Sequence, residues 1–237
     1  DAHHLRNLTI SYGRLAELHG ALGAPAEMEL WFGKSFALTE RLCAADPENR
    51  MLQHDLIAIT EQLGELALHK RDFAGARARF QRNLAIAQTL SRAHPDNVDA
   101  VNSVAIAEGK LGNLALAVND PALARRHYER AMEITRALAA RDPLDRQRTR
   151  SLAVEHHRLG NALAAMGEQQ QALAQFEESL RLSRALAEQD PFSLRWATDI
   201  ATNLSRVSDM LVALGKDVVA RAQLVESLAV RERLAAA

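Results

Sequence analysis

Four prolines recur along this chain at a constant spacing of 48 residues: Pro47, Pro95, Pro143 and Pro191. Cutting the chain before each of them gives five segments that align without a gap: 1–46, 47–94, 95–142, 143–190 and 191–237. A fixed period of this length indicates a repeat architecture, in which each unit packs on a copy of itself. We therefore expect an array of five similar units rather than a protein with one central core.

Each unit has the apolar spacing of two helices. In the second unit, apolar residues recur at three- and four-residue steps, first at Leu52, Leu56, Ile59, Leu63 and Leu66 and then at Phe73, Ala76, Phe80, Leu84, Ala87 and Leu90. The chain is 48% hydrophobic but only 4% aromatic, so Ala and Leu must form most of the core, which favours helices over strands. Two helices of about 20 residues, with short connections, account for one unit.

Turn and capping residues recur with the same period. The first helix of each unit is expected to end near Gly23, Arg71, Asn119, Gly167 and Gly215, and Gly and Asn tolerate the left-handed conformation of a helix C-terminus. Asp72 and Asp120 follow this position as N-caps of the second helix. The prolines then end one unit, and the residues after them cap the next.

The aligned columns resemble the tetratricopeptide repeat. Leu63-Gly64 with Ala76 and Phe80, and Leu159-Gly160 with Ala172 and Phe176, have its spacing, although the first and last units have Ala16 and Ser208 in place of Gly. The unit is longer than the usual 34 residues and is similar to a long-repeat variety common in bacterial multidomain proteins. The resemblance implies an all-α fold, an α-α superhelix or solenoid of five helix-turn-helix repeats forming one domain over residues 1–237. It also implies that the first helices line a concave groove for a peptide or a partner's helix.

Two columns on the first helices are the candidate groove positions under this resemblance. One column reads Arg14, Gln62, Lys110, Arg158, Arg206, and the other reads Glu17, Glu65, Asn113, Asn161, Asp209. Asn amides both donate and accept hydrogen bonds, and Lys and Arg favour acidic side chains or a carboxylate. The predicted partner-binding residues are therefore Lys110, Asn113, His157, Arg158, Asn161, Arg206 and Asp209. The groove is expected to change from acidic to basic along its length. Alternatively, pairs such as Arg206 and Asp209 only satisfy each other at the surface.

Composition and motifs argue against several other classes of function. The net charge is -1, so no global basic field indicates nucleic-acid binding, and no apolar run suggests a membrane span. The single cysteine, Cys43, excludes an internal disulfide, and none of the nine His belongs to a zinc motif. Gly33-Lys34-Ser35 resembles the end of a phosphate-binding loop but lies within a predicted helix. No cofactor, metal or catalytic residue is predicted, and a cytoplasmic location is expected.

The sequence thus predicts a protein–protein interaction module, which we expect to be part of a larger bacterial signalling or effector protein. The alternative is a structural or regulatory spacer arm that self-associates and has no separate ligand. For an enzyme with a site assembled in the groove, the only candidate catalytic residues are His157 and neighbouring Ser or Asp. No polar capping helix closes either end of the array, so the exposed terminal faces predict either neighbouring segments in the intact protein or end-to-end self-association.

Overall fold

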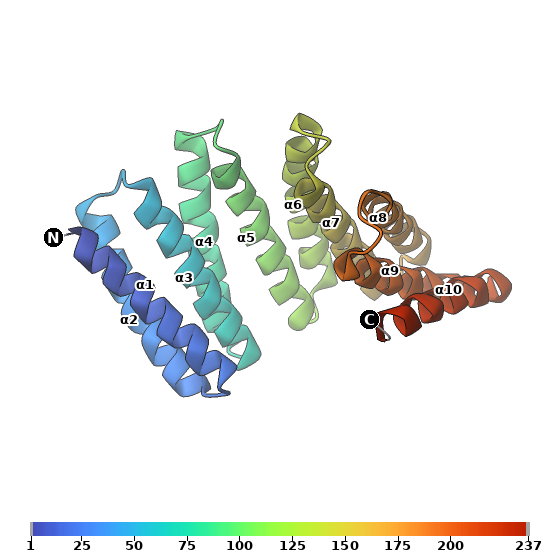
Figure 1. Cartoon of the computed structure of the whole chain (residues 1–237), viewed down its shortest axis with the longest axis horizontal. Helices are drawn as coiled ribbons and strands as arrows, with labels where there is room; N and C mark the ends of the chain where they lie inside the picture. Colours follow the sequence, from blue (N-terminus) through green and yellow to red (C-terminus); the bar gives the residue numbers. More distant parts are fainter. Residues whose placement is uncertain (1, 236–237) are drawn as a thin grey trace. The chain divides into compact units, whose positions relative to one another are not determined.

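The computed structural model describes residues 2–235, and within them the chain forms ten α-helices and no strand (Figure 1). The first helices of the five repeats are α1 (Ala2–Ala21), α3 (Arg50–His69), α5 (Val98–Ala117), α7 (Arg146–Ala165) and α9 (Leu194–Ala213). The second helices are α2 (Pro25–Ala45), α4 (Phe73–Ala93), α6 (Pro121–Arg141), α8 (Gln169–Gln189) and α10 (Asp217–Ala235). Equivalent helices begin 48 residues apart, which confirms the predicted all-α fold of five helix-turn-helix repeats.

The helices belong to two compact units, one ending at Leu114 and the other beginning at Ala115, within α5. In the first unit, α1 packs against α2, α2 against α3, and α3 against α4. In the second unit, each helix from α6 to α10 packs against its neighbour in the chain. The second helix of one repeat thus contacts the first helix of the next, as a stacked array requires. That residues 1–237 form one domain stays a prediction.

The first helix of every repeat ends in a left-handed residue. The five positions are those predicted, with φ of 69° at Gly23, 60° at Arg71, 61° at Asn119, 78° at Gly167 and 71° at Gly215. At Arg71 the backbone forms both bonds of a Schellman motif, from Asp72 N to Ala67 O at 2.8 Å and from Arg71 N to Leu68 O at 3.0 Å. The turn is therefore imposed by the repeat even where the residue is Arg, which the sequence did not favour for this conformation.

The second helices begin at the predicted caps. The Asp72 carboxylate accepts a bond from Gly75 N at 2.9 Å, and Asp120 accepts one from Leu123 N at 3.0 Å. These bonds satisfy donors that the first turn of a helix leaves unpaired. Asn49 and Asp145 cap first helices in the same way, whereas Ser193 occupies the equivalent place in α9 without a side-chain bond.

Within a repeat, the two helices approach closely at the predicted Gly and aromatic columns. A Cβ atom on Gly64 would lie 2.5 Å from Cε1 of Phe80, and one on Gly160 would lie 2.7 Å from Cε1 of Phe176. Both rings are fully buried. In the last repeat, Ser208 replaces the Gly, and its hydroxyl donates to Ala220 O at 2.9 Å. The small residue is thus needed because the ring lies directly over the helix backbone.

A buried polar bond, which sequence reasoning missed, also joins the two helices of four repeats. A side chain in the middle of the second helix donates to a main-chain carbonyl of the first: Ser35 to Thr9 O, Asn83 to Ile57 O, Ser179 to Ala153 O and Ser227 to Ala201 O. The distances are 2.8, 3.2, 2.8 and 2.8 Å. These donors are buried and hydrogen-bonded, as buried polar groups must be to avoid a desolvation cost.

Candidate functional site

The predicted partner-binding residues fall in both units. Lys110 and Asn113 lie on α5 in the first unit, whereas the other predicted residues lie in the second: His157, Arg158 and Asn161 on α7, and Arg206 and Asp209 on α9. All seven are exposed or half-buried, as a binding face requires.

Lys110 is held by two carboxylates of the preceding repeat. Its Nζ lies 2.9 Å from Glu61 Oε1 and 2.8 Å from Glu65 Oε1. Burial alone would lower the pKa of Lys110, but the hydrogen bonds and charges of Glu65 and Glu61 outweigh it and raise the pKa. Lys110 is therefore already paired inside the protein, and the expected change from acidic to basic along the groove stays a prediction.

Arg158 is held in a similar way by a buried acid on its own helix. Its Nη1 lies 2.5 Å from Oε1 of Glu155, which is only 5% exposed. Oε2 of Glu155 has no hydrogen-bond partner in the described part of the chain. Burial raises the pKa of Glu155 although Arg158 opposes this. Much of the charge of Arg158 is thus used inside the protein.

His157 belongs to a chain of polar side chains that crosses three helices. Its Nδ1 lies 2.8 Å from Oδ1 of Asn203 on α9, so Nδ1 must donate this bond. The Asn203 amide donates in turn to Ser183 Oγ at 3.4 Å, and Ser183 donates to Ser179 O at 2.9 Å. The ring of His157 also lies edge-on to Phe176, with centroids 5.4 Å apart. Burial lowers the pKa of His157, so the ring is neutral at pH 7.

A cavity of about 180 Å³ lies above this polar chain. It is lined by Ala153, Val154 and His157 of α7, Ser179 and Ser183 of α8, and Asp199, Thr202 and Asn203 of α9. At its edge, Asp199 accepts two bonds from the guanidinium of Arg150, at 2.9 and 3.4 Å. The same bidentate pair joins the first two repeats, between Arg6 and Asp55 at 2.7 and 3.2 Å. Fixed geometry of this kind keeps α7 and α9 in register.

Asn161 and Arg206 are the polar groups of this face with the fewest internal partners. Asn161 is half-buried, and none of the described residues forms a hydrogen bond with its amide. Arg206 is exposed and lies 3.6 Å from the exposed Asp209, a surface pair that contributes about 1 kcal/mol or less. Both side chains can therefore bond to a ligand at little cost.

Sequence reasoning found Asn161 but missed the polar residues under the face. Asn203 is 3% exposed, and its column reads Ser11, Ile59, Ala107, Glu155, Asn203, so polar and apolar residues both occur in it and it gave no clear signal. The column of Ser183 is mostly polar and reads Thr39, Ala87, Thr135, Ser183, Arg231, so Ser183 did not stand out either. No group of three or more His, Cys, Asp or Glu in residues 2–235 is placed to hold a metal ion. No described helix has the length and apolarity to cross a membrane.

The same part of the chain carries a family signature. Residues 157–192, from His157 through α8, match the model of the tetratricopeptide repeat. The match includes the Leu159-Gly160 pair and Phe176, whose close packing is described above. The chain therefore has a tetratricopeptide-type repeat fold. The ten helices of residues 2–235 form five repeats of 48 residues, each with two helices.

Solved structures with this fold cover nearly the whole tetratricopeptide array. BtubC from P. vanneervenii has a TM-score of 0.67 and 16% identity, over 97% of this chain and 92% of that one. A putative kinesin light chain with TPR-like repeats from Podospora anserina has a TM-score of 0.62 and 19% identity, over 99% of both chains. The apo form of RapI has a TM-score of 0.66 and 10% identity, over 95% and 70%. The comparison with curated protein sequences finds no match. At these identities the likeness establishes the fold, which is generally a scaffold for protein–protein interaction.

Proposed function

We propose that this protein is a cytoplasmic protein-binding scaffold, the tetratricopeptide region of a larger bacterial signalling or effector protein. Its binding face is formed by His157, Arg158 and Asn161 of α7 and by Arg206 and Asp209 of α9, and we call it the α7–α9 face. The observation that carries the proposal is the Asn161 amide, which is half-buried and has no hydrogen-bond partner among the described residues. A polar group in this position gains most from an external partner.

The chemistry of the α7–α9 face fits a segment of another protein. The Asn161 amide offers donors and an acceptor, the combination needed to bond the main chain of an extended peptide or the end of a helix. The surface pair of Arg206 and Asp209, at 3.6 Å, is weak, and a bidentate pair between Arg and a carboxylate is stronger. An acidic side chain of the partner would therefore replace Asp209 as the partner of Arg206. The rigid polar chain from His157 to Ser183 holds the face in place, so little ordering is required on binding. That Lys110 and Asn113 bind the same partner stays a prediction.

The test is a selection of random twelve-residue peptides displayed on phage against the immobilised chain, followed by calorimetric titration of a selected peptide. We expect peptides with an acidic residue, and we expect the double variant Asn161→Ala/Arg206→Ala to bind them about tenfold more weakly or worse. Gln81→Ala, which removes an exposed amide from α4, is the matched control and should leave the affinity unchanged.

The spacer-arm alternative gives the opposite outcome. A chain without a ligand of its own would select no peptide above background. Selected peptides whose affinity is the same for the double variant and for the unchanged chain would place binding elsewhere and contradict the proposed face.

A further inference from the structure

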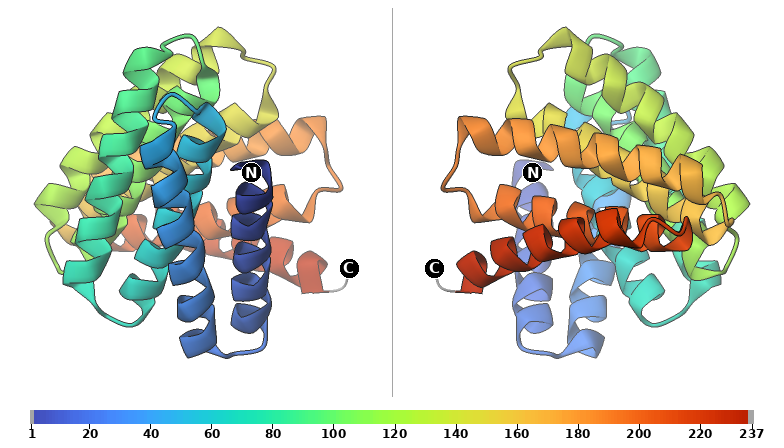
Figure 2. Two further views of the ribbon diagram at one scale, coloured as in Figure 1. Left: turned by 90° about the vertical axis from the view of Figure 1, so that its left-hand side faces the viewer. Right: turned by 90° about the vertical axis from the view of Figure 1, so that its right-hand side faces the viewer.

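The first helix of the array exposes a row of apolar side chains that the other repeats bury. Leu15 is 37% exposed and Leu18 is 53% exposed, whereas their equivalents in the second repeat, Leu63 and Leu66, are 4% and 7% exposed. In the other repeats this row packs on the second helix of the preceding repeat, as α3 does on α2 and α9 on α8. Figure 2 shows α1 from its outer side, where no helix of its unit covers it. The row therefore has the chemistry of the surface by which the other repeats contact each other.

The last helix exposes the complementary row. Leu224 and Leu228 are 54% and 55% exposed, whereas their equivalents in α8, Phe176 and Leu180, are 0% and 5% exposed. The rings and aliphatic groups of this row normally receive the first helix of the next repeat. Figure 2, in its right-hand view, shows α10 as the outermost helix of its unit. The exposed rows of α1 and α10 thus correspond to the two halves of the contact that joins neighbouring repeats.

The charged columns that flank this contact pair across the repeats. Glu40 bonds Arg82 of the next repeat, and the same two columns have the reversed pair Arg184 and Glu226, at 2.7 Å. The equivalent of Glu40 and Arg184 in the last repeat is Glu232. The equivalent of Arg82 and Glu226 in the first repeat is Lys34. A contact between the two ends would therefore place opposite charges together.

A second pair of columns gives the same result independently. Glu65 bonds Lys110 of the next repeat at 2.8 Å. The equivalent of Glu65 in the last repeat is Asp209, and the equivalent of Lys110 in the first repeat is Arg14. Both of these terminal residues are exposed, so their charges are accessible to another molecule.

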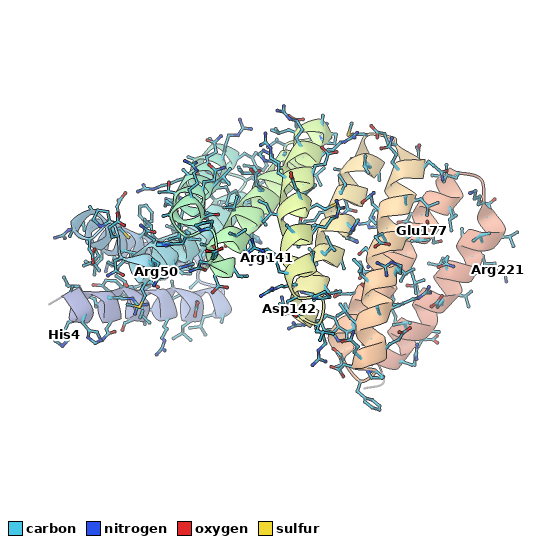
Figure 3. The ribbon with its side chains drawn as sticks, turned by 90° about the horizontal axis from the view of Figure 1, so that it is seen from above. His4, Arg50, Arg141, Asp142, Glu177 and Arg221 are labelled. Atoms are coloured by element: carbon cyan, nitrogen blue, oxygen red, sulfur yellow. The ribbon has the colours of Figure 1, made fainter. Side chains whose placement is uncertain are left out.

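A third column does not match and so supplies a control. Glu29 pairs with Lys70 of the next repeat, but Arg221, the equivalent of Glu29 in α10, would meet Leu22 in the first repeat. Arg221 lies on the exposed surface of α10 (Figure 3). Removing its charge is not expected to weaken the contact.

We propose that this chain binds a second copy of itself head to tail, with α10 of one copy packed on α1 of the next. Leu224 and Leu228 receive Leu15 and Leu18 of the other copy. Glu232 then pairs with Lys34, and Asp209 pairs with Arg14. The two surfaces differ, so the contact is heterologous and each copy keeps one surface for a further copy until a ring closes.

A mixing experiment with two variants tests this arrangement by sedimentation velocity over a range of concentrations. We expect the unchanged chain to associate increasingly with concentration. Leu18→Glu blocks one surface and Leu224→Glu blocks the other, so each variant alone should be monomeric. An equimolar mixture should form a dimer and nothing larger, because only one pair of surfaces is intact. Both residues are more than half exposed, and matching circular dichroism melting curves would verify that the variants fold.

Charge exchange tests the pairing of Glu232 with Lys34. Glu232→Lys and Lys34→Glu should each weaken association about tenfold, and the variant with both changes should regain it. Arg221→Ala is the control and should associate like the unchanged chain.

Three results would overturn the proposal. The first is a strictly monomeric unchanged chain at about 1 mM, the concentration scale of a contact worth only about 4 kcal/mol. The second is association that survives in Leu18→Glu alone, which would show a symmetric contact. The third is a double charge variant that remains as weak as the single ones.

Discussion

Arg71 is the residue whose backbone conformation least suits its side chain. It has φ of 60° at the end of α3, where other repeats have Gly or Asn. A left-handed conformation costs a residue with a Cβ atom about 1–2 kcal/mol, and Gly avoids this cost. We expect Arg71→Gly to raise the free energy of unfolding by about 1 kcal/mol, measured by urea denaturation.

The control for this prediction is the same substitution in a helix. Arg77 is exposed within α4, so Arg77→Gly should lower the free energy of unfolding by about 1 kcal/mol. An equal loss of stability in both variants would show that Arg71 is not under backbone strain.

Glu155 links stability to pH. Burial raises the pKa of its carboxyl group in the folded protein above the ordinary value of 4.5, so the folded state binds the proton more tightly than the unfolded state. The contribution of this group to stability is therefore full below that value and is lost as the pH rises through the folded pKa. Glu155→Gln removes this dependence, so its stability relative to the unchanged chain should increase from about pH 4 to pH 7.

Denaturation of both proteins at several pH values measures this difference, and other titrating groups cancel in it. A relative stability of Glu155→Gln that falls as the pH rises would show that Arg158 stabilises the charged carboxylate more than burial penalises it.

At the scale of single residues, the sequence predicted positions that recur and missed those that do not. The caps Asp72 and Asp120 and the left-handed column repeat every 48 residues, so alignment of the chain with itself revealed them. Asn203 and Glu155 are buried polar residues in a column where the second repeat has Ile59. Their roles depend on partners in other helices, which a period does not reveal.

Among the helices, α7 and α8 approach each other closely at Gly160. A Cβ atom there would lie 2.7 Å from the Phe176 ring, and the ring is completely buried. Gly160→Ala should therefore lower the free energy of unfolding by about 1–3 kcal/mol, because the ring must move within a packed core. Thermal unfolding followed by circular dichroism measures this loss of stability relative to the unchanged chain.

Gly33 provides the matched comparison within α2. A Cβ atom there would meet no atom within 4 Å, so Gly33→Ala should be stabilising, by about 0.5–1 kcal/mol. If both alanine variants were stabilised alike, helix propensity and not the contact with Phe176 would explain the glycine column.

The helix boundaries were the most predictable level of this structure. Apolar periodicity and the loops at Pro47, Pro95, Pro143 and Pro191 agree with these boundaries, and the helices begin 48 residues apart as expected. Contacts between repeats were less predictable, since the pairs Arg6–Asp55 and Arg150–Asp199 join residues 49 apart that no local pattern connects.

For the whole molecule, the pairing of charged side chains was the property that the sequence did not predict. The candidate columns suggested an acidic end followed by a basic centre, but Lys110 is paired with Glu61 and Glu65, and Arg158 is paired with Glu155. The chain therefore uses many of its charges to join its own helices. On the α7–α9 face, the Asn161 amide and the weakly paired Arg206 retain capacity for an external partner.

The central claim is that the α7–α9 face binds a segment of another protein. It is tested most directly by nuclear magnetic resonance of the ¹⁵N-labelled chain during titration with a selected peptide. The account predicts that the side-chain amide signal of Asn161 and the main-chain signals around Arg206 shift most. Shifts confined to the second helices α8 and α10, with the Asn161 signal unchanged, would contradict it.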